Sequence, residues 1–193
     1  MPANQVGQFM RDLRKQDGTA ARALEFLVLT AARSGEIRGA TWGEIDLREA
    51  VWTIPAARMK GEKEHRVPLS PACLKLLESL PRFKGNDLVF SAARGGKMHR
   101  SILVDVYQAM VGVDITAHGF RSTFRDWASE YTNFPREPVE MALAHAIGNK
   151  VEAAYRRGDL FEKRRRLMNE WARFCNTIQV EGKAIKIRGG ARG

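Results

Sequence analysis

The clearest β-type pattern of this chain lies in one region, and helical patterns stand on both sides of it. From Trp42 to Leu69 the sequence reads IDLREAVWTI and then PAARMKGEKEHRVPL, where the glycine-containing stretch MKGEKEH predicts a turn between two short strands. A chain with so little strand is expected to be α+β, mostly α-helical, with a small antiparallel sheet.

Apolar residues recur at helical spacing outside this region. Thr19 is expected to cap a helix that runs through Ala32, and Ser70 followed by Pro71 is expected to start another. Further helices are expected over residues 101–112, from Thr116 to Glu130, from Pro135 to Ala146, from Val151 to Arg157, and over 160–175. Asp159 and Glu162 have the spacing of a capping box at the start of the last of these helices. DLVFSA predicts a short strand or extended piece.

The length of 193 residues suits one domain. We expect residues 1–18 to be a linker or the start of the domain, residues 19–176 to be the domain, and residues 177–193 to be a basic tail, with one possible strand in VEGKAIKI. The apolar stretches fall short of the roughly 20 residues that span a bilayer, and the N-terminus lacks the apolar core of a signal peptide. The expected location is the cytoplasm.

The charge balance favours a polyanionic partner. Lys and Arg number 32 against 22 Asp and Glu, a formal charge of +10, so nucleic acid is the first candidate. Many solvated proteins are equally basic, and charge alone does not decide. Cys73 and Cys175 lie far apart, without a nearby Cys or His partner, so they indicate neither a disulfide framework nor a zinc site.

Four segments carry a more specific signal: AARSGEIRGATWGEIDL, MKGEKEHRVPLS, AHGFRSTFRDWA and LAHAIGNKVEAAY. They resemble the signature segments of tyrosine recombinases, the phage-integrase family, in that family's order. The ending KVEAAYRRGDLFEKRRRLMNEWA is similar to integrases of prophages and genomic islands. The resemblance covers about residues 19 to 176 and implies the family's catalytic domain, with a small three-stranded antiparallel sheet.

The resemblance assigns catalysis to six residues: Arg33, Lys60, His118, Arg121, His145 and Tyr155. It makes Tyr155 the nucleophile and Lys60 the lysine of a hairpin, with Lys63 as the alternative. Glu36 is expected to orient Arg33 or the nearby backbone. Within these segments, a minor departure from the family is Ala31-Ala32 before Arg33, where family members often have a glycine.

These residue types suit attack on a phosphodiester. Negative charge grows on two non-bridging oxygens, and the forked donors of Arg33 and Arg121 match them. The histidines can exchange protons with the phosphate and the tyrosine, and Lys60 can protonate the departing 5′ oxygen. This chemistry requires neither a metal nor a cofactor.

The implied function is site-specific DNA recombination, the integration or excision of a mobile element, through a 3′-phosphotyrosine. The implied partners are double-stranded DNA at attachment sites, further copies of the chain (a tetramer on DNA, a monomer alone) and directionality or DNA-bending proteins, with no membrane. Family members also carry an N-terminal core-binding domain, for which the eighteen residues before Thr19 leave no room.

Each residue also has an ordinary structural interpretation. Taken alone, Tyr155 would be a packing residue, Arg33 and Glu36 a surface pair, His118 a helix-start residue and His145 a core histidine. The run KRRRL at 163–167 is open between a solvated face and a DNA contact. Rival functions are a type IB topoisomerase, a DNA-binding module without catalysis, and a metal-dependent nuclease, for which the sequence lacks a carboxylate cluster.

Overall fold

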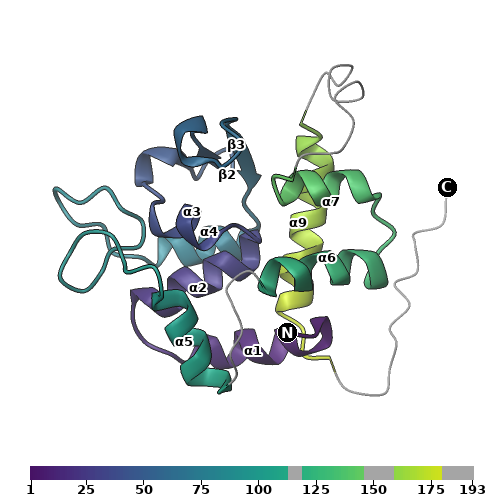
Figure 1. Cartoon of the computed structure of the whole chain (residues 1–193), viewed down its shortest axis with the longest axis horizontal. Helices are drawn as coiled ribbons and strands as arrows, with labels where there is room; N and C mark the ends of the chain where they lie inside the picture. Colours follow the sequence, from purple (N-terminus) through teal and green to yellow (C-terminus); the bar gives the residue numbers. More distant parts are fainter. Residues whose placement is uncertain (113–118, 146–158, 180–193) are drawn as a thin grey trace.

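The computed structural model describes residues 1–112, 119–145 and 159–179, and Figure 1 shows the whole chain. The α-helices are α1 (Val6–Leu13), α2 (Thr19–Thr30), α3 (Ser34–Arg38), α4 (Pro71–Glu78), α5 (Ile102–Val111), α6 (Gly119–Tyr131), α7 (Arg136–Ala142) and α9 (Phe161–Cys175). The short 3₁₀ helices are η1 (Ala3–Gln5), η2 (Trp42–Glu44) and η3 (Ala56–Arg58), and the strands are β1 (Ile45–Asp46), β2 (Val51–Ile54) and β3 (His65–Pro68). The expected class, mostly α-helical with a three-stranded antiparallel sheet, is confirmed.

Two long helices, α2 and α9, form the centre of the fold. α2 contacts α3, α4, α5 and α9, while α9 also contacts α1, α7 and β3. Leu24, Leu27 and Val28, which the sequence pattern places on the inner face of α2, are fully buried. The indole nitrogen of Trp171 on α9 donates to the Val28 carbonyl at 2.7 Å, and this bond joins the two helices. In Figure 1, α6, α7 and α9 lie together on one side of α2.

Aromatic rings fill the spaces between these elements in three groups. Phe26 on α2 has its ring centre 5.5 Å from that of Trp52 on β2 and 5.4 Å from that of Phe90. The other groups are Phe9, Tyr107 and Phe120, which join α1, α5 and α6, and Phe124, Trp127, Trp171 and Phe174, which join α6 to α9. Rings of this size bury large apolar areas, so these groups hold the helices in place.

The sheet has the strand order β1-β2-β3. Trp52 on β2 stands opposite Val67 on β3, and MKGEKEH lies in the connection between these strands, as expected. The stretch IDLREAVWTI is two strands and not one, because the chain turns before Ala50, whose φ is +52°. Within the described part of the chain, DLVFSA makes isolated bridges at Leu88 and Ser91 but no regular strand.

Helix starts agree with the sequence in one place and differ in two. Ser70 caps α4 as expected, since its hydroxyl accepts from the Cys73 N–H. Thr19 does not cap α2: it is the first helical residue, and Gly18, with a φ of +94°, stands before it. The expected capping box at Asp159 does not form either, because Leu160 occupies the N-cap position of α9 with a φ of +50°.

Residues 1–18 pack into the same core as the rest of the described chain. Val6, Met10 and Leu13 on α1 are fully buried. α1 also lies close to the end of α9, since a Cβ on Gly7 would stand only 2.0 Å from the Thr177 carbonyl oxygen. No helix within the described ranges has the length and apolar character needed to cross a membrane.

Three local expectations lie outside the described residues. They are the cap at Thr116, the helix from Val151 to Arg157, and the possible strand in VEGKAIKI. The neighbouring helices are placed, however. α6 ends at Tyr131, close to its expected end at Glu130, and α7 starts at Arg136, one residue after the expected Pro135. The expected end of that helix at Ala146 is wrong, because α7 ends at Ala142 and the chain turns at Ala144, whose φ is +49°.

Candidate active site

Arg33 stands at the junction of α2 and α3. α2 ends at Ala31, whose φ of +51° is left-handed, and Arg33 then forms the N-cap of α3. A glycine would adopt the conformation of Ala31 with less strain. The Arg33 Nη1 donates to Glu36 Oε1 at 2.8 Å, and the Arg33 backbone N–H donates to Glu36 Oε2 at 2.7 Å. Glu36, only 5% exposed, thus holds both the backbone and the side chain of Arg33.

Arg121 reaches the same place from α6. Its side chain is buried, and its Nη1 donates to the Ala31 carbonyl at 2.7 Å. Its Nη2 donates to the Leu143 carbonyl and also lies 3.1 Å from His145 Nε2. Arg121 therefore joins the end of α2 to the turn that follows α7.

His145 comes directly after that turn, in which Ala144 has a φ of +49°. Its Nδ1 lies 2.7 Å from Glu140 Oε2, and its Nε2 faces the Nη2 donor of Arg121. Because arginine has no acceptor, Nε2 must accept there, and the ring proton is on Nδ1, which donates to Glu140. The side chain is 34% exposed, so solvent reaches the imidazole ring.

Glu140 collects positive groups from two helices. Its Oε1 lies 3.1 Å from the Arg125 Nε on α6 and 3.6 Å from the Arg136 Nε on α7. Burial alone would raise the pKa of Glu140, but the hydrogen bond with His145 and the nearby arginines lower it below its ordinary value. Glu140 is thus an anion that orients His145. The sequence analysis did not single it out, since its spacing of five residues from His145 gives no helical-face signal.

The two arginines of the site repel each other. Burial lowers the pKa of Arg121 to about 10, and Arg33 acts in the same direction, while Glu36 and Glu140 oppose the shift. This pKa is far above neutrality, so the Arg121 guanidinium is charged at pH 7. The Arg121 Nε is buried and has no hydrogen-bond partner among the described residues. A bound anion would relieve the repulsion between the two cations, so the site suits a phosphate group.

His65, at the start of β3, is a second residue that the sequence analysis missed. Burial lowers its pKa to about 4, and Arg164 acts in the same direction, against Glu36 and a hydrogen bond with the Ala142 carbonyl. Arg33 lies near enough to lower the pKa further. His65 is thus neutral at pH 7, lies near Arg33 and Glu36, and forms a hydrogen bond with the last residue of α7. The sequence signal that could have pointed to His65 is its position in the signature segment MKGEKEHRVPLS, five residues after Lys60.

The contacts of the described residues do not place the other three expected site residues, Lys60, His118 and Tyr155. Lys60 is exposed in the connection between η3 and β3 and makes no hydrogen bond or ion pair with another described residue. His118 and Tyr155 lie outside the described ranges. The structure therefore places Arg33, Glu36, Arg121 and His145 together and leaves the other three positions as predictions.

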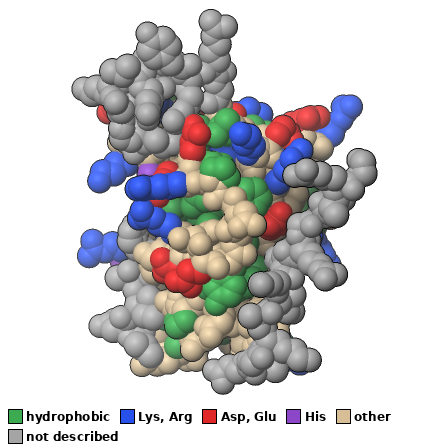
Figure 2. Space-filling view, turned by 90° about the vertical axis from the view of Figure 1, so that its right-hand side faces the viewer, with side chains coloured by type: hydrophobic (Ala, Val, Ile, Leu, Met, Phe, Trp, Pro, Cys, Tyr) green, Lys and Arg blue, Asp and Glu red, His purple; other side chains and the backbone are tan. Residues whose placement is uncertain are grey.

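Exposed cations gather on the surface in several places. Figure 2 views the side of α6, α7 and α9, where Lys and Arg side chains stand along the upper and left margins with acidic side chains among them. Two loops, 60–66 and 93–100, are rich in exposed basic residues: Lys60, Lys63, Arg66, Arg94, Lys97 and Arg100. Such loops can contact phosphate groups without reading a base sequence.

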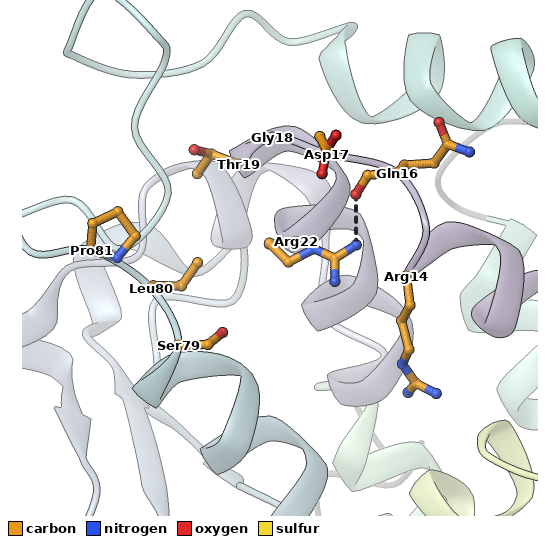
Figure 3. A pocket seen from close by; sticks show the side chains of 9 residues that line it. All are labelled: Arg14, Gln16, Asp17, Gly18, Thr19, Arg22, Ser79, Leu80 and Pro81. Carbon is orange, nitrogen blue, oxygen red and sulfur yellow. Dashed lines mark hydrogen bonds between the residues drawn. The ribbon is translucent and has the colours of Figure 1, made fainter.

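Two adjoining hollows, with volumes of about 330 and 540 Å³, lie near the connection of α1 to α2 and the end of α4 (Figure 3). In Figure 3, Arg22 donates to the Gln16 carbonyl at 3.1 Å. Arg22 and Arg14 also pair with Glu25, at 3.0 and 2.6 Å. None of the active-site residues lines either hollow, and both arginines are already paired with Glu25, so these hollows are not the candidate site.

Comparisons with known sequences identify the family of the chain. The sequence pattern of the phage integrase family matches residues 1–160. Prophage integrase IntA of Escherichia coli (strain K12) is 35% identical over 175 residues, which cover 88% of this chain and 42% of that protein. The integrase of Shigella phage Sf6 is 31% identical over 179 residues, covering 89% and 46%. The chain thus spans about half the length of the curated relatives it matches.

Solved structures show the same fold. The XerA recombinase matches with a TM-score of 0.60 and 18% identity, covering 86% of this chain and 61% of XerA. XerH, bound to its difH substrate in a pre-cleavage complex, matches with a TM-score of 0.60 and 20% identity, covering 76% and 47%. Because the family's sequence pattern extends over 160 of the 193 residues, the chain belongs to the phage integrase family.

Proposed function

We propose that this chain is the catalytic part of a tyrosine site-specific recombinase, which cuts and rejoins DNA through a 3′-phosphotyrosine at Tyr155. The observation that carries the proposal is the convergence of Arg33, Arg121 and His145 from three separate segments. These are positions to which the sequence resemblance assigns catalysis. Membership of the family supports the same activity.

In this proposal, Arg33 and Arg121 hold the two non-bridging oxygens of the phosphate to be cut. Their guanidinium groups are fixed by Glu36 and by the carbonyls of Ala31 and Leu143, so they do not have to be reoriented during the reaction. Fixed donors stabilise the charge that grows on these oxygens in the transition state.

The reaction splits into two balanced steps. The Tyr155 oxygen attacks phosphorus, a phosphotyrosine forms at the 3′ side, and the 5′ oxygen leaves with a proton. A 5′ hydroxyl then attacks the phosphotyrosine and releases the tyrosine, so no outside energy source is needed. A free tyrosine is only about 0.1% ionised at pH 7, a deficit of about 4 kcal/mol, which the nearby cations and a base must offset.

His145 is the described residue best placed to move a proton. Because Glu140 fixes the ring proton on Nδ1, Nε2 carries the lone pair that faces Arg121 Nη2, and it is the ring atom that can take up a proton. Lys60 is proposed as the acid for the departing 5′ oxygen, and His118 as a donor to the phosphate.

The proposed partner is double-stranded DNA. The exposed basic loops at 60–66 and 93–100 and the formal charge of +10 support it, and the similar XerH was solved on DNA. Exchange of four strands between two duplexes needs four nucleophiles, so four copies are proposed to act together on paired sites.

A covalent adduct is the test of this proposal. The chain is incubated with a pool of nicked duplexes whose sequence is randomised around the cleavage position, in EDTA, and analysed on a denaturing gel. We expect an adduct with the unmutated chain and none with Tyr155→Phe. Tyr131→Phe is the matched control, since Tyr131 is 45% exposed on α6, and it should form the adduct normally. An adduct with Tyr155→Phe, or activity that needs added Mg²⁺, would refute the proposal.

The acid role of Lys60 has its own test. A 5′-bridging sulfur in place of oxygen gives a leaving group with a pKa near that of a thiol, about 8 to 9, which needs no protonation. On this DNA, Lys60→Ala should cleave nearly as fast as the unmutated chain. Lys63→Ala, a second exposed lysine of the same loop, should be close to normal on both substrates. If the sulfur-containing DNA restores cleavage by Lys63→Ala and not by Lys60→Ala, the general acid is Lys63 and not Lys60.

A further inference from the structure

A buried cation stands where the described chain resumes at residue 159. The Arg164 side chain on α9 is 2% exposed. Its Nε donates to the Asp159 carbonyl at 2.7 Å, its Nη2 to Asp159 Oδ2 at 2.6 Å and its Nη1 to the Arg66 carbonyl on β3 at 2.5 Å. Such burial is costly unless the donors are matched, and here every nitrogen of the guanidinium has an acceptor. Asp159 is therefore tied to both α9 and β3.

Asp159 also binds a second arginine. The Arg66 Nη1 lies 3.5 Å from Asp159 Oδ2, and the Arg66 guanidinium carbon stands 4.1 Å from the centre of the Phe161 ring. The Phe161 N–H donates to Asp159 Oδ1 at 3.1 Å. We call these four residues, Arg66, Asp159, Phe161 and Arg164, the Asp159 cluster.

The chain is held at the active site on the other side of residues 146–158, where the two site arginines bind the carbonyls of residues 143 and 144. Tyr155 comes four residues before Asp159 and ten after His145. An extended chain covers at most about 3.6 Å per residue, so Tyr155 is within about 14 Å of Asp159 but only within about 36 Å of His145. Asp159 therefore restricts the tyrosine more tightly than the active-site turn does.

We propose that the Asp159 cluster is a positioning device, which sets where Tyr155 stands relative to Arg33 and Arg121. The inference rests on the proposed function, because it takes Tyr155 as the nucleophile. Attack needs the tyrosine oxygen aligned with phosphorus, and a displacement of about 1 Å can slow a reaction about 10²-fold. The cluster also divides the run KRRRL: Lys163 and Arg166 are exposed, whereas Arg164 is turned inward.

Asp159→Asn is the informative variant. The Asp159 side chain is 41% exposed, and the amide keeps an oxygen for the Phe161 N–H, so the fold is less at risk than with a change at Arg164. Asp159→Glu restores the charge between the two arginines. Arg165→Gln is the matched control, because Arg165 also lies over the Phe161 ring, at 4.8 Å, but pairs with Glu162 at 3.5 Å.

The first readout is the rate of adduct formation on the same pool of nicked duplexes. Asp159→Asn should form the adduct at least tenfold more slowly at saturating DNA, while its half-saturating DNA concentration stays within twofold of the unmutated value. Asp159→Glu should recover to within about threefold, and Arg165→Gln should match the unmutated chain. If Asp159 had a merely structural role, Asp159→Asn would lower the thermal midpoint without slowing adduct formation at saturating DNA while leaving the half-saturating DNA concentration unchanged.

The second readout does not depend on activity. The chain has three tyrosines, so labelling with 3-fluorotyrosine gives three ¹⁹F signals, and Tyr155→Phe identifies one of them. Asp159→Asn should shift or broaden the Tyr155 signal and leave those of Tyr107 and Tyr131, which report on the fold, unchanged. An unmutated adduct rate in Asp159→Asn, or a common change of all three signals, overturns the positioning role. An unmutated chain that forms no adduct overturns the proposed function, and the positioning role with it.

Discussion

Glutamine in place of Glu36 should disconnect Arg33 from the active site while the fold survives. The carboxylate accepts from Arg33 twice, from the backbone N–H at 2.7 Å and from Nη1 at 2.8 Å. A glutamine side chain of the same shape offers one oxygen and one NH₂ group. Whichever way the amide is turned, its NH₂ group faces a donor of Arg33, so one of the two bonds must be lost.

The size of the effect follows from that lost bond. A hydrogen bond to a charged group contributes about 1.5 to 3 kcal/mol, so the free energy of unfolding should fall by this amount. For a chain of this length the thermal midpoint should fall by about 3 to 12 °C. If the side-chain bond is the one lost, Arg33 is no longer aligned, and adduct formation should slow toward the roughly 10²-fold loss typical of one missing transition-state donor.

Glu25→Gln is the matched control for this experiment. Glu25 on α2 is also 5% exposed and also holds arginines, Arg14 at 2.6 Å and Arg22 at 3.0 Å, but it lies away from the active site. Both variants should lose similar stability in thermal melts. Only Glu36→Gln should lose adduct formation, measured well below both thermal midpoints. Equal adduct rates in the two variants would show that Arg33 does not depend on Glu36.

Three further predictions concern other parts of the structure. His65 has a pKa of about 4 in the folded chain and 6.5 in the unfolded chain, so unfolding takes up a proton between these pH values, and stability should fall as the pH drops from 6.5 to 4. Urea unfolding of His65→Asn should show a flatter dependence of stability on pH. An unchanged dependence would contradict the low pKa of His65. Gly7→Ala should lower the thermal midpoint by several degrees, since its Cβ would meet the Thr177 carbonyl at 2.0 Å, whereas Gly35→Ala, with nothing within 4 Å, should not. Arg121→Lys should slow adduct formation about 10²-fold, because one ammonium cannot replace a buried fork of donors; a rate within threefold would refute this.

Local pattern was sufficient for the elements and for the residue types of the site. The helical spacing of Leu24, Leu27 and Val28 predicted the buried face of α2, since an amphipathic helix must turn that face toward the core. The cap at Ser70 was correct for a similar reason, because the hydroxyl and the following proline act within one turn. The resemblance to a known family pointed to Arg33, Arg121 and His145, and the fold brings these three residues together. Local pattern failed at Thr19 and Asp159, where a left-handed or glycine residue starts the helix instead.

Packing between distant segments decided the rest. Glu140 fixes the proton of His145 only because the turn after α7 brings the ring back over the helix, and Arg121 meets both only because α6 packs beside that turn. Arg164 reads as one charge in the basic run KRRRL, yet it is buried because β3 offers it a carbonyl from nearly a hundred residues away. Such contacts depend on how the helices lie against the sheet, and a period along the chain records only which face of each element is apolar. The sequence therefore indicates which residue types are present, while the fold determines which of them form hydrogen bonds and ion pairs with one another.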